Sequence, residues 1–164
     1  MKMSVFERGA FDSAHSPVRF IERNYMLLLL SSEFVTISFM NRPIFFVDDD
    51  KVILNLMEFT FQSRQDYDVL CFHTGEECLE KLSLDPRLIV LDHILAGVGE
   101  NTLNGLETLK EIRKVNKEVP VVILTGQGDD ELLTEFMENG ANRYLTKDDF
   151  FIDSLIETIQ DMIR

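Results

Sequence analysis

The sequence has no excess of positive charge and little cysteine. Its net charge is −13, with 16 lysine and arginine residues against 29 aspartate and glutamate residues. Such a chain repels the phosphates of nucleic acids and the headgroups of anionic lipids, so neither nucleic acid nor a membrane is expected as a partner. Its two cysteines, Cys71 and Cys78, match no metal or redox spacing. We interpret them as reduced thiols of a cytoplasmic protein.

The chain also lacks a long uninterrupted apolar run. The most apolar stretch, residues 25–40, is interrupted by Ser31, Ser32 and Glu33. It is short for a membrane span, and a glutamate is costly in lipid. No small-residue cleavage pattern of a signal peptide follows it. Residues 1–41 have equal numbers of acidic and basic side chains. We expect them to be an extension of uncertain role that contributes nothing to function, with a packed helix or a membrane tether as alternatives.

Short apolar segments alternate with amphipathic segments from residue 42 onwards. Period-two and continuous apolar runs predict strands at 44–47, 68–73, 88–91, 120–124 and 143–145. Helical periodicity predicts helices at 51–61, 75–82, 106–115, 131–139 and 151–163. Gly140 is a stop signal for the fourth of these helices. Strands that alternate with helices imply a parallel sheet covered on both faces.

Two of these helices have apolar positions that we expect to face the core. In the first helix they are Val52, Ile53, Leu56, Met57 and Phe59. In the third helix they are Leu106, Leu109, Ile112 and Val115.

Polar side chains follow four of the predicted strands. Asp48 and Asp49 follow the first strand, Asp92 the third, Thr125 the fourth, and Lys147 comes just after the fifth. Parallel strands end at one edge of their sheet, where ligands bind in open α/β folds. Carboxylates, a hydroxyl and an ammonium gathered there supply a nucleophile, a cation site and charge neutralisation, which phosphoryl transfer requires.

Residues 42–164 resemble the receiver domain of two-component response regulators. The resemblance rests on Val-Asp-Asp-Asp at 47–50, Leu-Asp at 91–92, Leu-Thr-Gly at 124–126 and Tyr-Leu-Thr-Lys at 144–147. It implies an α/β, flavodoxin-like (βα)5 fold, a doubly wound five-stranded parallel sheet with strand order 2-1-3-4-5. The chain ends with the fifth helix, so we expect a stand-alone receiver with no output domain.

By this resemblance Asp92 is the phosphoacceptor, which takes its phosphoryl group from a histidine kinase or a histidine phosphotransfer protein. Mg²⁺ is expected on Asp48, Asp49, Asp92 and the backbone carbonyl of Ile94. The protein is then a signalling phosphoacceptor that catalyses only its own phosphorylation and dephosphorylation. Helix capping is the ordinary alternative for these aspartates, and Asp50 is expected to cap the first helix.

The same resemblance assigns four residues to contact or sense the phosphoryl group. Lys147 reaches its oxygens, Thr125 donates its hydroxyl, Gly126 leaves space for it, and Tyr144 turns inward on activation. Phosphorylation then shifts the face made by the fourth helix, fifth strand and fifth helix towards a second conformation, which a downstream protein recognises. A surface lysine, a strand-end threonine and a half-buried tyrosine are the ordinary alternatives.

Three positions depart from the family pattern. Gly105, which opens the third helix, lies thirteen residues after Asp92, so the intervening loop is long, with its extra residues around 97–102 and Ala96 where proline is usual. Asp148 replaces the proline that normally follows the lysine, so we expect a trans peptide and an altered setting for Lys147. Ile94 is apolar, which suggests slow hydrolysis of a phosphorylated Asp92.

Two other functions fit parts of the sequence. The altered loop and the missing proline allow a pseudo-receiver that binds partners without phosphorylation. Asp48-Asp49-Asp50 also fits the Asp-x-Asp motif of haloacid-dehalogenase-type phosphatases, with Thr125 and Lys147 in later motifs. That reading leaves Asp92 without a role.

Overall fold

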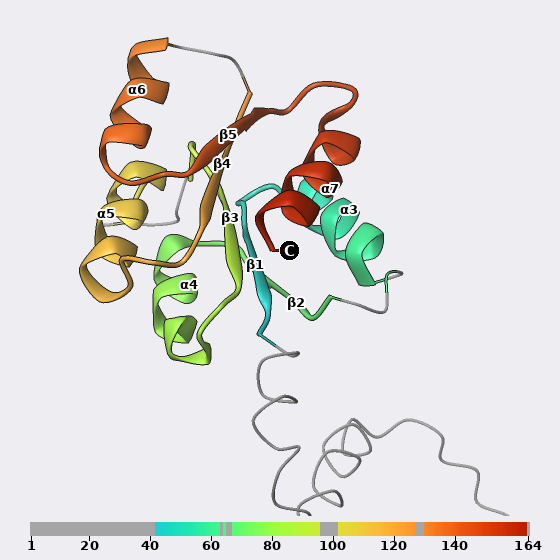
Figure 1. Cartoon of the computed structure of the whole chain (residues 1–164), viewed down its shortest axis with the longest axis horizontal. Helices are drawn as coiled ribbons and strands as arrows, with labels where there is room; N and C mark the ends of the chain where they lie inside the picture. Colours follow the sequence, from blue (N-terminus) through green and yellow to red (C-terminus); the bar gives the residue numbers. More distant parts are fainter. Residues whose placement is uncertain (1–41, 63, 65–66, 96–101, 127–129, 164) are drawn as a thin grey trace, which may run out of the picture. The chain divides into compact units, whose positions relative to one another are not determined.

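The computed structural model describes residues 42–62, 64, 67–95, 102–126 and 130–163 (Figure 1). The expectations for residues 1–41, and for residues 96–101 of the loop after Asp92, lie outside the described residues. Within the described ranges, no helix has the length and apolarity that a bilayer crossing requires.

Five parallel strands form one sheet in the order β2-β1-β3-β4-β5, so the predicted fold and strand order are confirmed. The strands are β1 (Ile44–Val47), β2 (Val69–Phe72), β3 (Leu88–Asp92), β4 (Val121–Thr125) and β5 (Arg143–Thr146). All residues of the three central strands, β1, β3 and β4, are buried. Continuous apolar runs are typical of strands covered on both faces, and β1, β3 and β4 have such runs in the sequence.

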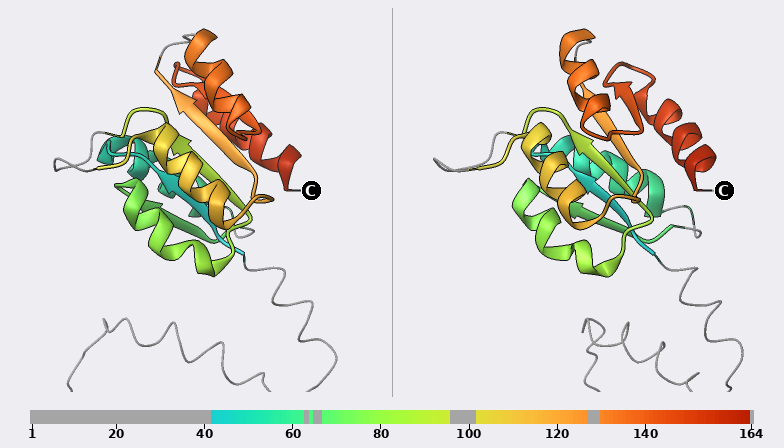
Figure 2. Two further views of the ribbon diagram at one scale, coloured as in Figure 1. Left: turned by 90° about the vertical axis from the view of Figure 1, so that its left-hand side faces the viewer. Right: turned by 60° about the vertical axis from the view of Figure 1, so that its left-hand side comes forward.

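Helices cover both faces of the sheet. They are α3 (Lys51–Gln62), α4 (Gly75–Lys81), α5 (Gly105–Val115), α6 (Asp130–Glu138) and α7 (Phe151–Met162), with a 3₁₀ turn at Leu82–Leu84. Helices α4, α5 and α6 lie on one side of the sheet and α3 and α7 on the other (Figures 1 and 2). Each side has its own buried apolar cluster. The predicted helices and strands are confirmed, with ends that differ by at most two residues.

Two local motifs fix the start of α5 and the end of α6. Asn104 accepts a hydrogen bond from the Glu107 N–H, and the Glu107 side chain accepts one from the Asn104 N–H. This capping box sets where α5 begins. At the end of α6, Gly140 has a φ of 98°, and the N–H groups of Gly140 and Ala141 donate to Met137 and Phe136. That is a Schellman motif, so the stop signal at Gly140 is confirmed.

The predicted inward face of α3 is largely wrong. Its buried side chains are Leu54, Met57 and Phe61. Val52, Leu56 and Phe59, which we expected to face the core, are exposed, and Phe59 retains 77% of its accessible surface. Of the expected positions, Met57 is buried and Ile53 packs at the edge of the core. Val115 on α5 is likewise exposed rather than inward. Both helices have apolar residues on more than one face, so periodicity alone could not orient them.

The reoriented face of α3 predicts opposite effects for two phenylalanines two positions apart. Phe61 is fully buried and packs against Phe46 and Tyr67, so Phe61→Ala should lower the free energy of unfolding by about 3–5 kcal/mol. Phe59→Ala should change it by about 0.5 kcal/mol or less. Urea unfolding of the two variants measures both values. A larger loss for Phe59→Ala would restore the face expected from the sequence.

Candidate functional site

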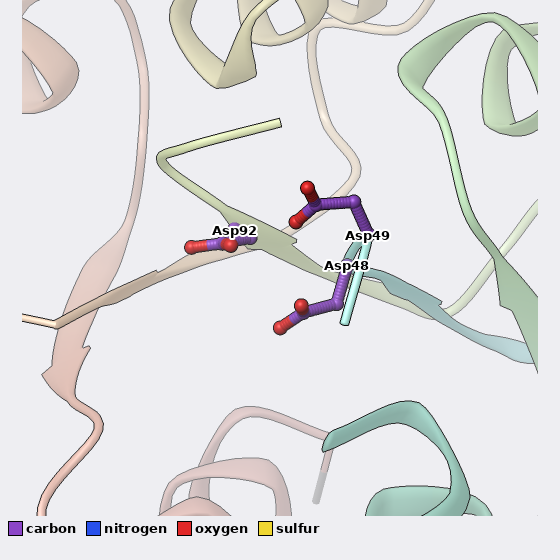
Figure 3. Close-up of side chains that lie close together, drawn as sticks. All are labelled: Asp48, Asp49 and Asp92. Carbon is purple, nitrogen blue, oxygen red and sulfur yellow. The ribbon is translucent and has the colours of Figure 1, made fainter. Parts of the chain in front are cut away.

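Three carboxylates meet at the carboxyl edge of the sheet. Asp48 and Asp49 follow β1, and Asp92 is the last residue of β3, the neighbouring strand. Figure 3 shows Asp92 beside the two consecutive aspartates, whose side chains leave the chain in different directions. One oxygen from each of the three lies within 4.8 Å of the others. The topology therefore brings together the acids that the sequence placed at separate strand ends.

Lys147 joins this group from the edge of the sheet. Its Nζ lies 2.7 Å from Asp48 Oδ2 and 3.0 Å from Asp92 Oδ2. The lysine side chain is 17% exposed and Asp48 is fully buried. Burial raises the pKa of Asp48, and the Asp92 charge adds to this, while the hydrogen bond from Lys147 opposes it. Burial alone would lower the pKa of Lys147, but its hydrogen bonds to Asp48 and Asp92 outweigh burial and raise that pKa.

The site suits a divalent cation. Three ionised carboxylates and one ammonium leave these four groups with a net charge of −2. Asp92 Oδ1 is buried, and among the described residues it has no hydrogen-bond partner. Buried carboxylate oxygens are normally paired or bound to metal. Carboxylate oxygens are also the ligands that Mg²⁺ prefers, so the residues present fit this ion.

Thr125 ends β4, which lies between the strand of Asp92 and the strand that leads to Lys147, and Gly126 directly follows it. Thr125 is fully buried, and its carbonyl accepts a 2.7 Å hydrogen bond from the Lys147 N–H. This bond fixes the backbone of the lysine against that of the threonine. Gly126 is exposed, and a Cβ built there meets no atom of the described part of the chain within 4 Å. The expectation that Gly126 leaves space for a phosphoryl group stays a prediction.

Two other predicted residues lie outside the carboxylate cluster. Tyr144 is on β5, opposite Ile123 of β4, and is 48% exposed. Its position is the outward one expected of an inactive switch, and its movement stays a prediction. Ile94, two residues after Asp92, has an exposed side chain. The expectations that its carbonyl binds a metal and that its side chain slows hydrolysis also stay predictions.

Asp148 takes over the turn in which proline is usual. The described backbone has no cis peptide bond, so the Lys147–Asp148 bond is trans, as expected. The Asp148 side chain accepts a 2.9 Å hydrogen bond from the Phe150 N–H, and its carbonyl accepts one from Phe151. These bonds lead the chain into α7. Lys147 still reaches both aspartates, so the loss of proline does not displace it.

Two residues at the site were missed by sequence reasoning. Gly105 lies directly against Asp92: a Cβ there would be 2.3 Å from the Asp92 carbonyl oxygen and 2.7 Å from that of His93. The glycine had been noted only as the start of a helix. The His93 ring packs beside Asp92, with Nδ1 3.4 Å from Asp92 Oδ1. A single histidine after a strand gives no signal of such a contact.

A family model named response regulator receiver domain matches residues 44–160. The chain belongs to this family. The receiver is 35% identical over 109 residues to the alkaline phosphatase synthesis transcriptional regulatory protein PhoP of Bacillus subtilis, covering 66% of this chain and 43% of PhoP. It is 38% identical over 118 residues to a CpxR homolog, a transcriptional regulatory protein of Haemophilus influenzae, covering 72% of this chain and 48% of the relative.

Solved structures agree with this assignment. The receiver domain of Francisella response regulator 1452 has a TM-score of 0.65 at 30% identity, over 75% of this chain and 97% of that one. The chemotaxis protein CheY4 of Vibrio cholerae has a TM-score of 0.64 at 26% identity, over 74% and 98%. The match spans less than half the length of the two curated relatives, so their activities as whole proteins do not transfer to this receiver.

The pairing of Lys147 predicts a pH-dependent loss of stability in Lys147→Met. Removing one partner of a buried ion pair costs about 3 kcal/mol or more. Without the ammonium, the pKa of Asp48 rises further, so the folded receiver binds more protons than the unfolded chain. Its stability should therefore fall as pH rises from about 5 to about 8. Urea unfolding across this range measures the effect. Lys110→Met, which removes an exposed lysine 3.7 Å from Glu135, is the control and should show little pH dependence.

The close approach of Gly105 to the main chain of Asp92 predicts that a methyl group is not tolerated at position 105. Gly105→Ala forces the backbone of Asp92 and His93 to move, because the atoms that its Cβ would meet belong to the main chain. We expect a loss of about 1–3 kcal/mol in unfolding free energy. Gly126→Ala is the matched control, since its Cβ meets nothing. Equal stabilities of the two variants would show that the start of α5 can shift freely.

Proposed function

We propose that this receiver accepts a phosphoryl group on Asp92 from the phosphohistidine of a histidine kinase or histidine phosphotransfer protein. The observation that carries the proposal is the buried Asp92 carboxylate beside Asp48 and Asp49, with Lys147 3.0 Å from one of its oxygens. A carboxylate oxygen of Asp92 forms the new P–O bond. The P–N bond to the donor imidazole breaks, and its electron pair stays on the imidazole nitrogen.

The other residues of the site supply positive charge and hydrogen bonds. Asp48, Asp49, Asp92 and the Ile94 carbonyl would hold Mg²⁺, which, when bound, offsets the charge of the entering phosphoryl oxygens. Lys147 supplies a positive point charge to the same oxygens. Thr125 supplies a hydroxyl donor, and Gly126 leaves the entry beside it open. Apart from this self-phosphorylation and its reversal, we propose no catalytic activity.

The modified receiver is proposed to signal through α6, β5 and α7. This face presents the exposed side chains of Met137, Tyr144 and Phe150, which suits contact with a downstream protein. A cytoplasmic receiver without nucleic acid contact is the form expected from the sequence. The curated relatives, however, are named as transcriptional regulators, so their comparison gives no support to the absence of nucleic acid.

The proposal is tested by intact mass after incubation with phosphoramidate and Mg²⁺. We expect a gain of one phosphoryl group that requires Mg²⁺ and is absent in Asp92→Asn, because Asp92 has one oxygen 3.0 Å from Lys147 and a second oxygen without a hydrogen-bond partner among the described residues. Lack of phosphorylation with phosphoramidate and with acetyl phosphate would favour the pseudo-receiver. Hydrolysis of a phosphate ester that survives Asp92→Asn and is lost in Asp48→Asn would favour the phosphatase.

A further inference from the structure

The side chain of His93 is the titratable group nearest the acceptor that the proposed function leaves unused. It follows Asp92 directly, and its ring is largely buried, with 11% of the side chain exposed. Its Nδ1 faces two oxygen atoms, the Leu124 carbonyl at 3.2 Å and Asp92 Oδ1 at 3.4 Å. Both oxygens accept hydrogen bonds, so the nitrogen between them has to carry a hydrogen.

The two oxygens differ in whether another group already donates a hydrogen bond to them. The Leu124 carbonyl already accepts a 3.0 Å hydrogen bond from the backbone N–H of His93. Asp92 Oδ1, in contrast, is buried without a hydrogen-bond partner among the described residues. The other oxygen of the same carboxylate lies 3.0 Å from Lys147 Nζ. Each of the two carboxylate oxygens of Asp92 therefore faces one nitrogen: Oδ2 faces Lys147 Nζ and Oδ1 faces His93 Nδ1.

We propose that His93 is a positioning residue whose Nδ1–H orients the Asp92 carboxylate opposite Lys147. This rests on the proposed function of Asp92. The ring donates a hydrogen bond and transfers no proton, so the phosphoryl step is unchanged in its atoms: the P–O bond to Asp92 forms as the P–N bond of the donor breaks. With both oxygens directed, the carboxylate is held in one plane before the donor arrives, which lowers the entropy lost in the transition state.

The surroundings of the ring allow this role to be separated from packing. His93 lines a cavity of about 410 Å³ between the loop after β3, α5 and α6, with Leu132 and Phe136 on its far wall. An apolar side chain at position 93 would therefore contact apolar neighbours. Asparagine and leucine have similar shapes, but only asparagine keeps an N–H near the place of Nδ1. His93→Asn and His93→Leu thus form a matched pair.

The test compares the rates at which phosphoramidate modifies Asp92 in wild type, His93→Asn and His93→Leu, measured by intact mass with Mg²⁺. We expect His93→Leu to be about tenfold slower, the effect of one hydrogen bond to a charged group. His93→Asn should stay within about twofold of wild type, because it keeps a donor. Urea unfolding checks that both variants fold. Equal rates in the two folded variants would overturn the proposal.

A second measurement decides the proposal without phosphorylation. Imidazole ¹H–¹⁵N spectra of the unmodified protein at about pH 8, where ordinary histidines are neutral, report which ring nitrogen carries hydrogen. The His93 signal is identified by its absence in His93→Asn, since the chain has three histidines. We expect hydrogen on Nδ1. Hydrogen on Nε2 alone would overturn the proposal even if Asp92 accepts phosphate, whereas an unmodified wild type with hydrogen on Nδ1 would overturn only the proposed function.

Discussion

The contact of one ammonium with two buried carboxylates is the constraint on which the rest of the site depends. Asp48 directly follows β1, and Asp92 ends the neighbouring strand β3. Both are buried, so their charges repel in a region that water does not screen. Lys147 approaches from β5, and β4 lies between β5 and β3. The long stem of lysine spans that strand and brings the ammonium to 2.7 and 3.0 Å from the two acids. A shorter cation at position 147 would not reach them.

The scaffold has to hold these charges in place against their own repulsion. Three fully buried strands and an apolar cluster on each face of the sheet fix the strand ends. Gly105 brings the start of α5 against the Asp92 main chain, where any side chain would collide. On the other side, the Lys147 N–H is bound to the Thr125 carbonyl. Asp92 and Lys147 are therefore positioned by contacts of their main chain, and rotation of side chains alone cannot change these positions.

The sequence was sufficient for the parts of this arrangement that follow from strand ends. Apolar runs that stop at Asp48, Asp92 and Thr125 place those residues at one edge of a parallel sheet, whatever the details of packing. The orientation of α3 was not predictable in this way. Apolar residues such as Val52, Leu54 and Phe59 occur on all sides of this helix, so their spacing does not show which side is buried. The contact of His93 with Asp92 depends on a side-chain rotamer, for which sequence spacing carries no information.

The contacts of Lys147 with Asp48 and Asp92 suggest how the proposed phosphorylation of Asp92 affects residues outside the site. In the proposed function, phosphoryl oxygens on Asp92 compete with Asp48 for the ammonium of Lys147. Lys147 directly follows β5, which carries the exposed Tyr144, and Asp148 binds the Phe150 N–H at the start of α7. A shift of the lysine therefore acts on the strand and on the turn together. An exposed edge strand has fewer packing contacts to resist such a shift than the buried strands β1 and β3, so in the proposed function the change at Asp92 is passed to the surface around β5, which a partner can read.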